Sequence, residues 1–86
     1  MTTREIRALA ARLIERDGWC TETFAEKDGS RCIAGAILAA SADRTEYSQT
    51  AEEIERELGC GTLMQWNEAP GRTVEDVLAA LRGEAR

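Results

Sequence analysis

Residues 32–42, from Cys32 to Ala42, read CIAGAILAASA and form the longest uncharged and most apolar run of the chain. Apolar residues fall on every side of a helix drawn over this run, which is typical of a helix buried almost all round. Its alanines and its glycine would let neighbouring elements approach closely. We therefore predict a helix over about residues 31–42, capped by Ser30, in the middle of the domain.

Amphipathic patterns on both sides of this run predict three more helices. Over residues 3–17 the apolar side chains recur every three or four residues, Thr2 and Glu5 have capping-box spacing, and Gly18 stops the helix. Thr50 and Glu53 also have capping-box spacing, so we expect a further helix over about residues 50–58. Residues 43–47 would form the polar connection before it. The last helix covers about residues 74–82, capped by Thr73. The pattern predicts a mainly α, compact four-helix domain with an irregular segment over residues 19–31 that can hold one short hairpin.

Size and charge narrow the class of protein. The 86 residues indicate a single domain over residues 1–86, with residues 83–86 as a frayed tail. The net charge is −5, from 16 acidic and 11 basic residues, and this disfavours direct nucleic-acid binding, which needs clustered Lys and Arg. The sequence has no apolar run long enough for a transmembrane helix, and its N-terminus lacks the apolar core of a signal peptide. We therefore expect a cytoplasmic protein that does not engage a membrane.

The side chains available for chemistry argue against catalysis. The chain has no His, the commonest general base, and its three cysteines lack the paired spacing of a structural zinc site. We predict no enzymatic activity, no cofactor and no metal. Cys20, Cys32 and Cys60 are expected to be reduced, partly buried thiols. Two alternatives are a Cys20–Cys32 bridge across the irregular segment and, more remotely, a metal held by three thiolates and a carboxylate.

An acidic band covers residues 43–57, where six acids stand against two bases. Such a surface suits docking onto a basic partner protein, and its ordinary alternative is a solvated helix face. The residues that we assign to partner binding are Glu46, Glu52, Glu53, Glu55 and Glu57.

The loop before the last helix offers a different kind of surface. Backbone N–H groups at a helix start, together with Arg72, could hold an anion, while Trp66 stacks on a planar group and Asn67 hydrogen-bonds to it. In the structural alternative, Trp66 belongs to the core, Asn67 and Thr73 serve as turn and cap, and Arg72 pairs with a nearby acid. The candidate ligand-binding residues are therefore Trp66, Asn67, Arg72 and Thr73.

Four short motifs follow one another along the chain: Gly18-Trp19-Cys20, Cys32-Ile33-Ala34-Gly35-Ala36, Trp66-Asn67 and Gly71-Arg72-Thr73. Together they resemble a family of small uncharacterised domains of actinobacteria and their phages, over about residues 4–82. That family has no assigned activity, so the resemblance implies a shared fold and a bacterial or phage setting, and no mechanism. It also implies that the motif residues meet in space. Glu68 departs from the family pattern, which often has Asp there.

These observations predict a small acidic, non-enzymatic binding protein that acts through protein–protein contact, such as an inhibitor encoded by a phage or mobile element. The alternative is a small-molecule or anion binder that uses the loop before the last helix.

Overall fold

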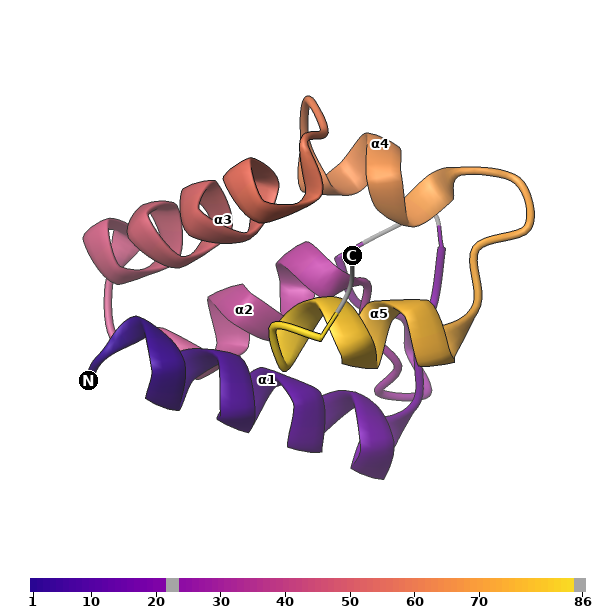
Figure 1. Ribbon diagram of the computed structural model, residues 1–86. Helices are drawn as coiled ribbons and strands as arrows, with labels where there is room; N and C mark the ends of the chain where they lie inside the picture. The colour runs from indigo at the N-terminus through magenta and orange to yellow at the C-terminus, as the bar shows by residue number, and fades with distance from the viewer. Residues whose placement is uncertain (22–23, 85–86) are drawn as a thin grey trace.

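The computed structural model describes residues 1–21 and 24–84 (Figure 1). Its described residues form no strand and five α-helices, whose bounds are α1 Thr3–Asp17, α2 Ile33–Ala40, α3 Arg44–Leu58, α4 Leu63–Glu68 and α5 Val74–Leu81. The prediction of a mainly α domain is confirmed, but the predicted number of helices was one too few. Of the predicted hairpin segment and tail, residues 22–23 and 85–86 lie outside the described residues.

The helices pack in a simple order. α2 contacts α1, α3 and α4, and Figure 1 shows it between α1 and α3. α5 packs on α1 and α3, so the apolar face of the last helix is directed mainly toward those two helices. Large, fully buried apolar side chains come from α1, α2, α3 and α5. They are Ile6, Ile14, Ile33, Ile37, Ile54, Val77 and Leu81.

The two helices with the clearest local signals begin as predicted. Thr2 caps α1 in a capping box with Glu5, and Thr73 caps α5 in a capping box with Asp76. Gly18, at a positive φ of 99°, ends α1 by donating its N–H to Ile14 O at 2.8 Å. Each of these signals lies within one helical turn, so the sequence alone is enough to read them.

α2 is shorter than predicted and has a different cap. Arg31 is held in extended structure by a parallel bridge to Trp19 and an antiparallel bridge to Ala25, so the helix cannot begin there. The cap is Cys32, whose Sγ accepts from the Gly35 N–H at 3.3 Å. Ser30, the predicted cap, instead donates its hydroxyl to Asp28 Oδ1 at 2.7 Å within the preceding turn.

α3 begins six residues before its predicted start. Asp43 is its cap and accepts from the Glu46 N–H at 2.9 Å, so residues 44–47, predicted as a connection, are helical. Thr50 lies in the middle of the helix, is fully buried, and donates its hydroxyl to Glu46 O at 2.8 Å. Tyr47 packs against the core and extends the apolar stripe one turn upstream, which favours the earlier start.

α4 is the helix that the predicted count omitted. Thr62 caps it by accepting from the Gln65 N–H at 3.2 Å, and Leu63 and Asn67 are its buried residues. Its tertiary contacts, described below for Asn67, explain why so short a helix is held in place.

Candidate functional site

Three of the five glutamates predicted to bind a partner lie on the side of α3 that faces α1. Glu46 accepts from the N-terminal ammonium at 3.0 Å, and Glu53 accepts from the Thr3 hydroxyl at 3.0 Å and from Arg7 at 2.7 Å. Glu57 receives two hydrogen bonds from Arg7, at 2.8 and 2.7 Å. This side of the acidic band therefore joins α3 to the N-terminal helix.

Arg7 is the cation at the centre of this contact, and its side chain is only 8% exposed. Beyond the two carboxylates, it donates to Leu81 O at 2.9 Å and to Ala80 O at 2.8 Å, at the end of α5. The hydrogen bond to Glu57 raises the pKa of the Arg7 guanidinium, while burial acts in the opposite direction. A single side chain thus ties α1, α3 and α5 together.

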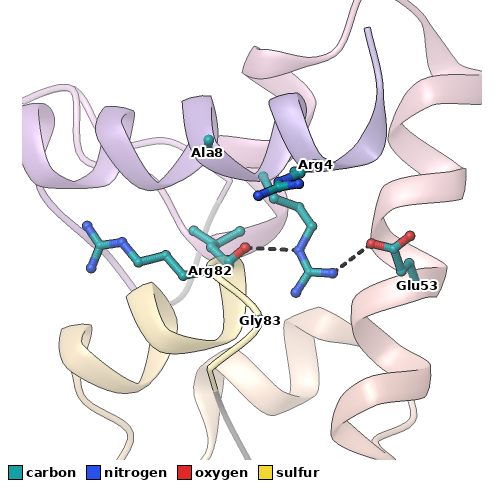
Figure 2. A pocket seen from close by; sticks show the side chains of 7 residues that line it. Arg4, Ala8, Glu53, Arg82 and Gly83 are labelled. Carbon is teal, nitrogen blue, oxygen red and sulfur yellow. Dashed lines mark hydrogen bonds and ion pairs between the residues drawn. The ribbon is translucent and has the colours of Figure 1, made fainter.

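A hollow of ≈ 290 Å³ opens beside Arg7, between α1 and the end of α5. Arg4 of α1 and Glu53 of α3 line it, and Figure 2 shows Gly83, just past the end of α5, below them. Arg82 also lines it but forms an ion pair with Glu15 of α1. Two of the arginines that line this hollow, Arg7 and Arg82, are therefore already paired with carboxylates. This pairing indicates a contact that holds the helices together.

The other two glutamates of the predicted band differ from each other. Glu55 accepts from the Leu63 N–H at 3.0 Å and so braces the start of α4. Glu52 is exposed and makes no ion pair within the described residues. The exposed face of α3 carries both signs of charge, since its exposed members are Arg44, Thr45, Gln49, Glu52, Arg56 and Glu57.

Two residues of the predicted ligand loop, Trp66 and Arg72, contact each other directly. The Arg72 guanidinium stacks on the Trp66 ring, with Cζ 3.9 Å from the ring centroid, and its Nε donates to Trp66 O at 2.8 Å. Arg72 also lies 4.0 Å from Asp76. Thr73 is the cap of α5. This arrangement matches the structural alternative stated for Trp66, Arg72 and Thr73, and the ligand-binding assignment stays a prediction.

Asn67, the fourth member of that set, is fully buried and joins three segments. Its Oδ1 accepts from Trp19 Nε1 at 2.7 Å and from the Ile33 N–H at 3.1 Å. Its Nδ2 donates to Cys20 O and to Thr21 O, both at 3.2 Å. The motif residues Trp19, Cys20 and Asn67 therefore do meet in space, as the resemblance implied, and the amide of Asn67 is fully occupied in joining them.

A second hollow, which sequence reasoning missed, lies between α2 and the start of α3. Its volume is ≈ 400 Å³, and its apolar lining comes from Phe24, Leu38 and Tyr47, with Asp43 and Arg44 among its polar residues. Phe24 is 43% exposed and Leu38 46% exposed, and among the described residues Met1 is the other large hydrophobic side chain that is exposed. We call this feature the Phe24–Leu38 hollow. The available signal was an aromatic residue in an otherwise polar loop.

The cysteines are thiols in the structure, and Cys32 is fully buried. Burial raises the pKa of the Cys32 thiol, although the Gly35 N–H bond lowers it. Within residues 1–21 and 24–84, no three His, Cys, Asp or Glu side chains are grouped so that they could hold a metal ion.

The described part of the chain contains no helix with the length and apolar character needed to cross a membrane. Comparison with curated proteins and with solved structures finds no match to the chain. The profile of one protein family matches residues 1–86, and the chain therefore belongs to DUF6197, a family of unknown function.

Proposed function

We propose that this protein is a small, non-enzymatic binding domain that docks onto a partner protein through the Phe24–Leu38 hollow. The observation that carries the proposal is the pairing of two exposed large hydrophobic side chains around one hollow. Scattered apolar residues on a surface need no explanation, but apolar residues gathered at a concave site are typical of interaction surfaces. The proposed docking surface thus moves from the acidic band to the side of α3 where Tyr47 lies.

The partner would insert a bulky apolar side chain between Phe24 and Leu38. Such anchors in desolvated pockets supply most of the binding free energy at protein interfaces, and a polar rim excludes water around them. Asp43 and Arg44 are placed to form part of that rim. An occupied hollow would cover apolar surface that otherwise faces solvent.

The net charge of −5 supports a partner with a basic surface, because opposite charge accelerates encounter over distances near the Debye length. In this proposal charge governs the association rate, while the hollow governs the lifetime of the complex. The proposal extends to an inhibitor encoded by a phage or mobile element, in the cytoplasm, which fits a small acidic domain without an evident catalytic group.

The test compares two variants that add the same charge at exposed positions. Leu38→Lys changes the hollow, and Gln49→Lys changes the exposed face of α3 away from it. Each tagged protein is incubated with lysate of the native host, and captured proteins are quantified by mass spectrometry after circular dichroism has shown equal helix content. We expect the specific partner to be lost with Leu38→Lys and retained with Gln49→Lys.

Equal capture by Leu38→Lys and the unchanged protein would reject the hollow as the docking site. The contribution of charge is measured separately, as the salt dependence of the association rate with the purified partner. We expect the association rate to fall as salt rises, and Glu52→Lys to lower it without a comparable change in the dissociation rate. Glu53 and Glu57 are unsuited to that experiment because both hold Arg7.

A further inference from the structure

Two backbone segments run side by side immediately before α2. Trp19 and Arg31 form a parallel bridge, in which the Arg31 N–H donates to Gly18 O at 3.0 Å and the Cys20 N–H donates to Arg31 O at 3.1 Å. In a parallel pair, the residues that follow a bridge lie opposite each other and their side chains point to the same face. Here those two residues are Cys20 and Cys32.

Beyond the bridge, the side-chain amide of Asn67 stands between the two segments and bonds to both. It donates to Cys20 O and accepts from the N–H of Ile33, the residue after Cys32. Neighbouring strands lie about 4.8 Å apart, and a disulfide needs Cα atoms separated by roughly 4.4 to 6.8 Å. Cys20 and Cys32 each directly follow a residue of the bridged pair, which brings their Cα atoms close to the range that a disulfide needs.

We propose that Cys20 and Cys32 are a redox modification site, at which a reversible disulfide forms across the entrance to α2. Cys20, which is partly exposed, is the initial nucleophile. Its thiolate attacks the S–S bond of a small disulfide such as glutathione disulfide and releases one glutathione thiolate. Cys32 then loses its proton to solvent, and its thiolate displaces the second glutathione. The two cysteines lose two electrons and two protons, and the oxidant becomes two glutathione thiols.

The cap of α2 is compatible with this change. Cys32 Sγ accepts from the Gly35 N–H and lies 3.5 Å from Met64 Sδ. A disulfide sulfur still has lone pairs for the Gly35 N–H, so oxidation removes only the weak S–H donation to Met64. Burial of Cys32 raises the pKa of its thiol, so the second step is expected to be the slower one.

The experiment uses the native chain in a glutathione redox buffer, followed by acid quenching, alkylation and tryptic mapping without reductant. Cleavage after Arg16, Lys27, Arg31 and Arg44 places Cys20 in residues 17–27 and Cys32 in residues 32–44, while Cys60 falls in residues 57–72. We expect a linked peptide of 17–27 with 32–44 and the loss of two hydrogens from the intact mass, both reversed by dithiothreitol. The Cys60→Ser variant should behave identically.

The variant Cys32→Ser keeps an oxygen that can cap α2 and should form no intramolecular bridge, so folding and bridging are separated. The proposal would be overturned by a bridge that forms only in urea or by a bridge that links the peptide of residues 57–72. It would also be overturned if the reaction stopped at the mixed disulfide with glutathione. The oxidised protein should also unfold at a temperature higher by on the order of 10 °C, because the bridge removes conformational freedom from the unfolded chain. A lower unfolding temperature would show that the native backbone has to distort, and would equally overturn it.

The bridge would close residues 20–32 into a ring that contains Phe24, one wall of the Phe24–Leu38 hollow. Redox state would then regulate partner docking, and this consequence alone rests on the proposed function. The peptide map needs no partner, and the Leu38→Lys capture experiment needs no oxidant. Failure of the bridge and failure of the docking site are therefore distinguished.

Discussion

Gly35 marks the closest approach between α2 and the loop before it. A Cβ built on Gly35 lies 1.9 Å from Phe24 O and 2.8 Å from Phe24 C, far inside van der Waals contact, and that carbonyl also accepts from the Cys32 N–H at 3.3 Å. Gly35→Ala would normally stabilise a helix interior by about 1 kcal/mol. Here we expect destabilisation by roughly 2 kcal/mol or more, because backbone must move. Urea denaturation measures this change in the free energy of unfolding.

Gly61→Ala is the matched control for that substitution. Its built Cβ meets only the end of the Gln65 side chain, at 3.1 Å, and the backbone there is not in the positive-φ region. We expect a change within about 0.5 kcal/mol. If Gly35→Ala were equally mild, the close packing of the Phe24 segment on α2 would be wrong.

Asn67 is the residue whose loss should cost most among the polar side chains. Asn67→Ala would leave an indole N–H, a backbone N–H and two carbonyls without their partner at buried and partly buried positions. We expect the free energy of unfolding to fall by about 3 kcal/mol or more. Gln65→Ala, at an exposed position of the same helix, should leave it almost unchanged. Similar urea midpoints for the two variants would contradict this role of Asn67.

At the scale of the helices, Arg7 is what connects the end of α5 to α1 and α3. Arg7→Met would leave two carboxylates and two carbonyl oxygens without their cation, so we expect a loss of about 2–3 kcal/mol. Arg7→Lys should recover only part of it, because an ammonium cannot reproduce the bidentate geometry toward Glu57. Arg4→Met on the same helix is the control. Equal unfolding free energies for Arg7→Met and Arg4→Met would show that Arg7 does not connect these three helices.

The helices also show which features a sequence can reveal. α1 and α5 were predicted well because their caps and stripes are local signals. The start of α3 was missed because Thr50–Glu53 and Asp43–Glu46 both have capping-box spacing, and the packing of Tyr47 favours the second. The roles of Glu53 and Glu57 depend on Arg7, which is 46 residues from Glu53 along the chain. The sequence pattern predicts the charge of these residues and the helix in which they lie. Their partners follow only from the tertiary structure.

At the scale of the whole molecule, acid should be the condition that weakens the fold. Several carboxyl groups have pKa values below their ordinary ones because they accept hydrogen bonds in the folded chain, namely Glu5, Asp17, Asp28 and Glu46. For Asp17 the hydrogen bonds from Arg16 and then Arg31 hold the pKa well below its ordinary value of 3.8. Since the unfolded chain binds protons first as the pH falls, this stabilisation is complete above about pH 5 and is lost progressively below it.

Asp17→Asn tests that origin directly. The asparagine side chain still fits at the end of α1 but carries no charge for the two arginines, so the variant should be less stable than the unchanged protein at pH 7. The difference should shrink as the pH is lowered from 5 to 2, because protonation removes the same charge from the unchanged protein. Urea midpoints measured across that range should therefore converge, whereas Glu68→Gln, at an exposed position, should follow the unchanged protein throughout. Parallel curves for Asp17→Asn and the unchanged protein would show that the Asp17 ion pairs do not underlie the acid sensitivity.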